Sequence, residues 1–81
     1  MTLDEDREKT IKHIMNESQI ETGDNILDVG CGTGILTPFI LNRIGKEGRL
    51  TGIDVSDKMI NNALKKYKSD NLKFIVGDIQ N

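Results

Sequence analysis

The chain has 81 residues, of which 36% are hydrophobic and 30% charged, so its composition is that of one small globular domain rather than a disordered segment. Its formal net charge of −2 argues against a surface that binds nucleic acid through phosphate contacts. Cys31 is the only cysteine, the N-terminus lacks the features of a secretory signal, and no apolar run is long enough to span a bilayer. We therefore expect a cytoplasmic protein that does not contact membranes.

Apolar residues at helical spacing predict three helices. The first covers residues 4–20, with Asp4 and Asp6 as its candidate N-caps. The second covers residues 35–44, and Pro38 near its start marks either a kink or the true first turn. The third begins after Ser56 as N-cap and presents one apolar face, made of Met59, Ile60, Ala63, Leu64 and Tyr67.

Short aliphatic runs predict three strands, over residues 26–29, 50–54 and 72–76. Strands that alternate with helices form a parallel sheet with right-handed crossovers, so the fold class is α/β. Three strands connected in this way make one mononucleotide-binding half, in the order 3-2-1, with its ligand across the carboxyl ends of the strands. We expect a single domain over residues 1–81, with an N-terminal helical segment (1–22) and a β-α-β-α-β half (25–81).

The first predicted strand runs into a glycine-rich loop. Residues 26–34 read ILDVGCGTG, an aliphatic run around one acid followed by glycines at alternate positions. Glycine has no Cβ, so the N–H groups of such a loop and of the helix after it can closely approach a ligand. The pattern predicts a binding site for a nucleotide-like small molecule.

An acid also follows each of the other two strands. Asp54 ends the second strand, and an acid at that position can accept hydrogen bonds from both ribose hydroxyls while repelling a 2′-phosphate. Asp54 could instead cap the following helix in competition with Ser56. Asp78 comes after Gly77 at the end of the third strand, where it could equally be a turn residue.

The glycine spacing separates two families of nucleotide-binding fold. A dinucleotide fingerprint has its third glycine where this chain has Ile35. The chain instead resembles the class I S-adenosylmethionine-dependent methyltransferases, of the small-molecule type grouped with ubiquinone and menaquinone biosynthesis. The resemblance rests on three motifs in order: ILDVGCGTG at 26–34, GIDVSDKMI at 52–60 and FIVGDI at 74–79.

This resemblance implies the N-terminal half of a Rossmann-like class I methyltransferase fold, with S-adenosyl-L-methionine as cofactor and a small molecule as methyl acceptor. It implies that Asp28 and the backbone of residues 30–34 bind the methionine portion and that Asp54 binds the ribose hydroxyls. It also implies that Val55, Asp78 and the N–H of Ile79 contact the adenine. The cofactor-binding residues that it implies are Asp28, Gly30, Cys31, Gly32, Thr33, Gly34, Asp54, Val55, Met59, Gly77, Asp78 and Ile79.

The sequence assigns no catalytic residue. Cys31 has no histidine near it in sequence, and the resemblance places an unreactive small residue at its position, so a nucleophilic role is disfavoured. His13 is interpreted as a packing residue, and no His, Cys and acid cluster has the spacing of metal ligands. Two other functions stay open: an NAD-type nucleotide-binding domain and a non-catalytic interaction module.

Members of the resembled family continue far beyond the point where this chain stops. We therefore expect an N-terminal portion that is inactive alone. In the complete fold a fourth strand pairs with the free side of the first, so this edge is expected to be open here and apolar. An open edge is a template for another chain, which predicts self-association through residues 26–29.

Overall fold

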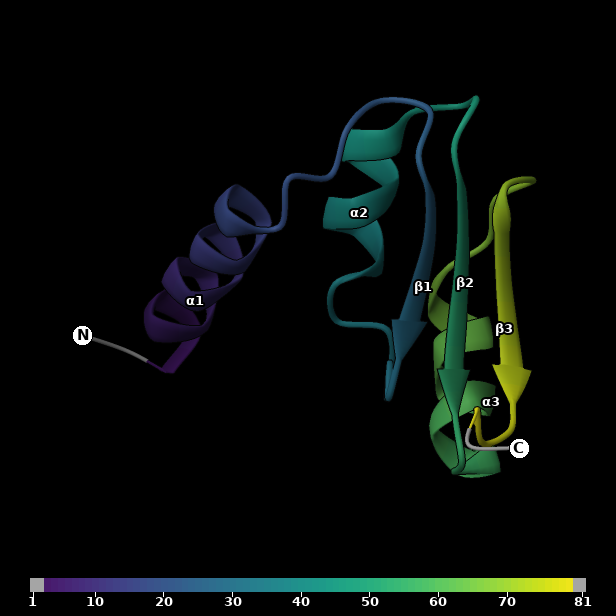
Figure 1. The fold of residues 1–81 in the computed structure, drawn as a ribbon. Helices are drawn as coiled ribbons and strands as arrows, with labels where there is room; N and C mark the ends of the chain where they lie inside the picture. The colour runs from purple at the N-terminus through teal and green to yellow at the C-terminus, as the bar shows by residue number, and fades with distance from the viewer. Residues whose placement is uncertain (1–2, 80–81) are drawn as a thin grey trace.

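The computed structural model describes residues 3–79. Its elements follow the chain as α1 (Leu3–Glu17), β1 (Asn25–Val29), α2 (Thr37–Ile44), β2 (Arg49–Asp54), α3 (Asp57–Lys66) and β3 (Leu72–Val76) (Figure 1). All six predicted elements are present. The predicted caps of the first helix are wrong, because α1 begins at Leu3 and already contains Asp4 and Asp6.

The second helix shows how the glycine loop and the proline set its start. Gly32 to Leu36 form turns, and α2 begins at Thr37, two residues later than predicted. Pro38 lies in the first turn, where its missing N–H is not needed, so of the two alternatives it marks the true first turn and not a kink. Thr37 is buried, and its N–H donates to the carbonyl of Gly34 at 3.0 Å.

The three strands form one parallel sheet in the order β1-β2-β3, which confirms the predicted order 3-2-1. The register pairs Ile26 with Leu50 and Leu50 with Leu72. In Figure 1 the three arrowheads point the same way, so the carboxyl ends of all strands meet at one edge of the sheet. This is the edge at which a ligand is expected.

The core lies between one face of the sheet and the helices. Ile11 and Met15 of α1 pack with Ile40 and Ile44 of α2 and with Leu50 of β2, and all five side chains are buried. In Figure 1, α2 stands between α1 and the sheet. The first helix is therefore held by the second and does not cover a strand of its own.

The other face of the sheet is uncovered in the described part of the chain. Leu27 and Val29 are 54% and 52% exposed, whereas Leu50 and Gly52 on the helical face are buried. Right-handed crossovers place both connecting helices on the same face, which accounts for the difference. None of the described helices is long and apolar enough to cross a membrane.

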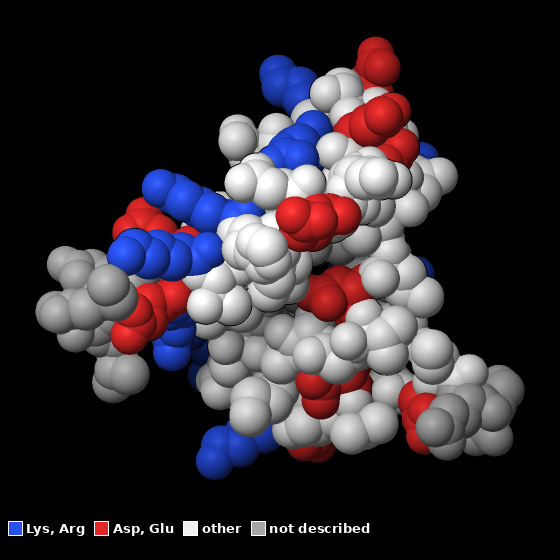
Figure 2. Space-filling view, turned by 60° about the vertical axis from the view of Figure 1, so that its left-hand side comes forward, with Lys and Arg blue, Asp and Glu red and all other residues white. Residues whose placement is uncertain are grey.

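Charged side chains do not form a continuous surface of one sign on the face that Figure 2 shows. Lysines and arginines lie among aspartates and glutamates there, without an unbroken basic stripe. This mixture agrees with the small negative net charge of the whole chain. It provides no extended phosphate-binding surface on this face.

Candidate functional site

The glycine loop turns back onto the end of β2. The N–H groups of Gly30 and Cys31 both donate to the carbonyl of Ile53, at 2.7 and 3.1 Å. Gly32 has a φ of +59°, a backbone conformation that residues with a Cβ rarely adopt. A Cβ built on Gly30 or Gly32 would meet nothing within 4 Å, so the outer side of the loop is open space next to exposed backbone.

Asp54 ties this loop to the next one. Its Oδ2 accepts from the N–H of Gly32 at 2.8 Å, and its Oδ1 accepts from the N–H of Ser56 at 2.9 Å. These N–H groups hold the pKa of the Asp54 carboxyl below its usual value, so it is ionised near neutral pH. The N-cap of α3 is Ser56, whose hydroxyl accepts from the N–H of Met59 at 3.3 Å. Asp54 is therefore not the helix cap, and its carboxylate binds the glycine loop instead.

Asp28 lies in β1 opposite Gly52, on the half-buried face of the strand. Burial raises the pKa of its carboxyl. Among the residues that the structure describes, none donates a hydrogen bond to this carboxylate. A carboxylate that has lost water without gaining a donor is stabilised by a cation or a donor from a ligand.

The end of β3 closes the third side of the site. The N–H of Gly77 donates to the carbonyl of Asp54 at 2.9 Å, which holds the last loop against β2. A hollow of about 170 Å³ lies where the three strands end. Its lining consists of Val29, Gly30, Ile53, Asp54, Val55, Gly77, Asp78 and Ile79.

Six of the twelve residues implied by the resemblance line this hollow, and the loop from Cys31 to Gly34 adjoins it through the Asp54 bond. Val55 and Ile79 expose 70% and 53% of their surface, so an apolar ligand could cover them. Met59 does not line the hollow. Its side chain is 43% exposed, so this member of the predicted apolar face of the third helix is not buried.

Cys31 contributes packing in this structure. Its side chain is 7% exposed and faces Gly52, because a Cβ built on Gly52 would lie 3.0 Å from Cys31 Sγ. Burial, helped by the charges of Asp28 and Asp54, raises the pKa of the thiol. A neutral, buried thiol is a poor nucleophile, so only the backbone of Cys31 is available to a ligand.

Two residues at the site were missed by the sequence analysis. Ile53 holds the loop through its carbonyl, and no side-chain signal could indicate this role. Tyr67 follows α3, and its ring packs against the loop: a Cβ built on Gly34 would lie 3.2 Å from two of its ring carbons. The sequence placed Tyr67 only on the apolar face of the third predicted helix.

Comparison with known proteins identifies the family. Residues 26–81 match the family described as methyltransferase domain. The chain is 34% identical over 71 residues to the demethylmenaquinone methyltransferase of Staphylococcus epidermidis, covering 86% of this chain and 30% of that protein. It is 43% identical over 56 residues to the malonyl-[acyl-carrier protein] O-methyltransferase of Acetivibrio thermocellus, covering 69% of this chain and 19% of that protein.

Solved structures agree in fold. Coclaurine N-methyltransferase, bound to N-methylheliamine and SAH, is similar with a TM-score of 0.84 and 27% identity over 98% of this chain and 24% of that chain. A SAM-dependent methyltransferase from Aquifex aeolicus gives a TM-score of 0.76 at 27% identity, over 84% of this chain and 38% of that one. The chain thus spans 19% to 38% of these four proteins. It belongs to the methyltransferase domain family and has the Rossmann-like class I methyltransferase fold.

Proposed function

We propose that this chain is the cofactor-binding part of an S-adenosylmethionine-dependent methyltransferase whose methyl acceptor is a small molecule. The observation that carries the proposal is the open glycine loop fixed by Asp54 at the carboxyl edge of the sheet. The family match supports the activity, and the demethylmenaquinone methyltransferase relative supports the size class of the acceptor. When bound, S-adenosylmethionine supplies a methyl group attached to a positively charged sulfur.

The methionine portion of the cofactor fits the side of the site formed by β1 and its loop. Its ammonium group is the kind of cation that the half-buried Asp28 carboxylate lacks in the described part of the chain. The open space around Gly30 and Gly32 leaves room for a ligand beside loop N–H groups. Asp28 would therefore bind the ammonium, and residues 30–34, Thr33 and Gly34 included, would line the chain of the methionine.

The nucleoside portion fits the side formed by β2 and β3. Each oxygen of the Asp54 carboxylate accepts one N–H bond and keeps a lone pair for a ribose hydroxyl. Val55 and Ile79 offer exposed apolar surface to a flat adenine. Asp78, after Gly77 in the same hollow, would accept from the adenine amino group.

The same proposal covers the organisation and location of the chain. Residues 1–81 would act as one domain, in which the helical segment 1–22 supports the β-α-β-α-β half over 25–81. The shared core of α1, α2 and β2 supports this unity. Cys31 is a free, buried thiol, which is compatible with the reducing conditions of the cytoplasm.

A matched pair of glycine variants tests the cofactor proposal. Gly32→Val and Gly23→Val both place a branched side chain at a positive φ in open space, but Gly23 lies in the turn before β1. Calorimetric titration should show that the unmodified chain binds S-adenosylhomocysteine in preference to NAD. Gly32→Val should abolish this binding, and Gly23→Val should retain it. Equal affinity in both variants would refute the assignment of the loop.

We also propose that copies of the chain associate through the free edge of β1. Among the described strands β1 pairs only with β2, and its exposed Leu27 and Val29 give that end of the sheet an apolar surface. Sedimentation equilibrium at micromolar concentration should detect a dimer that Leu27→Lys dissociates. Leu64→Lys on α3 is the control, because this leucine is 46% exposed against 54% for Leu27. A monomer at all concentrations would contradict this proposal.

A further inference from the structure

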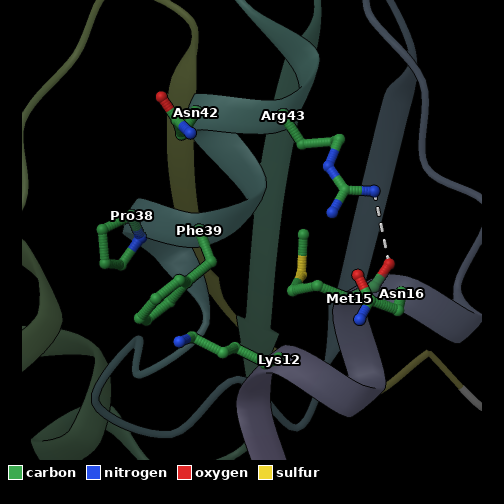
Figure 3. Close-up of a pocket in the computed structure, with 7 residues that line it drawn as sticks. All are labelled: Lys12, Met15, Asn16, Pro38, Phe39, Asn42 and Arg43. Carbon is green, nitrogen blue, oxygen red and sulfur yellow. Dashed lines mark hydrogen bonds between the residues drawn. The ribbon is translucent and has the colours of Figure 1, made fainter. Parts of the chain in front are cut away.

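A second and larger cavity lies between α1 and α2. Its volume is about 500 Å³, within the range of sites that bind small molecules. Its lining residues are Lys12, Met15 and Asn16 of α1 with Pro38, Phe39, Asn42 and Arg43 of α2 (Figure 3). None of them lines the hollow at the strand ends, so the two sites share no residue.

The walls of this cavity combine apolar surfaces with polar groups. The Phe39 ring is 39% exposed although it belongs to a helix whose other face is in the core. The ring of Pro38 and the thioether of Met15 line the cavity with it, and the amides of Asn16 and Asn42 add donors and acceptors. Such a lining suits a flat apolar body with a polar end.

The charges of the lining are both positive. Lys12 and Arg43 contribute two cations, and no acidic side chain is among the lining residues, although the whole chain has a net charge of −2. Figure 3 shows the Lys12 side chain extending toward the Phe39 ring. A ligand that placed an anionic group here would meet no like charge from the lining.

Arg43 is held in position by the end of α1 and by the segment that follows it. Its Nη1 donates to the carbonyls of Met15 and Ile20, at 3.3 and 3.5 Å. In Figure 3 the other terminal nitrogen points toward the middle of the labelled side chains. A guanidinium carries five N–H donors, so the bonds from Nη1 leave others that can bind an anion in a fixed orientation.

We propose that the cavity between α1 and α2 binds a small organic anion with a flat apolar body, such as an aromatic carboxylate. Phe39, Pro38 and Met15 contact the ring, and Arg43 and Lys12 bind the carboxylate. This inference is independent of the proposed cofactor site, because it depends on other residues and other elements.

Amide NMR on the 81-residue chain with naphthoate as the probe tests the proposal. Saturable shifts should appear in the amides of residues 12–16 and 39–43, with a dissociation constant of about 1 mM or lower for a ligand of this size. The neutral analogue naphthalenemethanol should bind more weakly. Lys12→Gln should raise the dissociation constant about threefold to fivefold, as expected for one exposed charge contact, and Lys66→Gln on α3 should leave it unchanged.

Phe39→Ala provides a second variant, which removes apolar contact and keeps both cations. It should weaken the binding of naphthoate and naphthalenemethanol alike. Naphthoate binding that is absent, occurs elsewhere, or is unchanged in both Lys12→Gln and Phe39→Ala would overturn the proposal. Titration with S-adenosylhomocysteine on the same sample should shift residues 30–34 and 54–56, so failure at either site is recognised separately.

Discussion

Gly52→Ala should destabilise the sheet beneath the glycine loop. A Cβ at this position would lie 2.8 and 2.9 Å from two ring carbons of Phe74 and 3.0 Å from Cys31 Sγ. Carbon atoms in contact normally lie about 3.5–4.0 Å apart, so both neighbours must move by several tenths of an ångström. Phe74 belongs to β3 and Cys31 to the loop, and the added methyl group therefore disturbs both.

The magnitude follows from two opposing effects. Overpacking of this kind costs about 1–3 kcal/mol, and replacing a strand glycine by alanine returns about 0.5–1 kcal/mol of backbone entropy. The two effects together lower the free energy of unfolding by at most about 2.5 kcal/mol, and the middle of each range gives a fall of about 1 kcal/mol. For a domain of this size a fall of about 1 kcal/mol corresponds to a loss of roughly 4–8 °C in melting temperature.

Urea unfolding followed by circular dichroism measures this loss, and S-adenosylhomocysteine titration measures its effect on the loop. Gly48→Ala is the matched control. Its Cβ would also be too close to a neighbour, at 2.7 Å from the Asp24 carbonyl oxygen, but Gly48 precedes β2 and so lies at the end of the strand away from the glycine loop. Both variants should lose stability, and only Gly52→Ala should lose affinity in its folded state. Adding Phe74→Leu should restore part of the stability; a Gly52→Ala protein as stable as the parent would refute the packing argument.

Three further predictions concern the charged and aromatic residues of the site. Backbone N–H groups lower the pKa of Asp54 in the folded chain. Its contribution to stability should therefore be present above the unfolded pKa of about 4 and be lost as the pH falls through the lower folded pKa. Asp54→Asn should remove this part of the acid dependence of the urea midpoint. Burial raises the pKa of Asp28, so the ionised carboxylate destabilises the fold at neutral pH. Asp28→Asn should therefore raise the urea midpoint at neutral pH, and this difference from the parent should disappear below about pH 4. The same variant should weaken S-adenosylhomocysteine binding. Tyr67→Ala should lower both the urea midpoint and the affinity, and Tyr67→Phe should retain both, because ring carbons are the atoms of Tyr67 nearest to Gly34.

The elements were predictable because their signals are local. Aliphatic runs of strand length, glycines that end them and a serine before a helical repeat each act within a few residues. The exact ends of the elements were harder to predict, because they depend on neighbouring turns as well as on these local signals. Ile35 and Leu36 have helical spacing with α2, but the turns that follow the glycine loop continue through them until Pro38 fixes the first helical turn.

The contacts that build the site were not predictable, because they join segments far apart in the sequence. An acid after a second strand indicated a ligand, yet its bond to Gly32 depends on the spacing of two loops that only the sheet brings together. The placement of Tyr67 against Gly34 likewise depends on how the end of α3 lies relative to the glycine loop.

The end of β2 organises the whole site. Two residues, Ile53 and Asp54, accept N–H groups from three different segments: Gly30, Cys31 and Gly32 of the first loop, Ser56 of the second and Gly77 of the third. This is possible because β2 is the middle strand of the order β1-β2-β3, so the loops of both neighbours end beside it. A loop fixed before the ligand arrives loses little further freedom on binding, which favours affinity. The Asp54 carboxylate therefore has two separable roles, holding Gly32 in the protein alone and accepting ribose hydroxyls in the proposed complex. Amide exchange at Gly32 in the absence of ligand reports the first role by itself: it should be faster in Asp54→Asn than in the parent, and unchanged exchange would leave Asp54 with a ligand-binding role only.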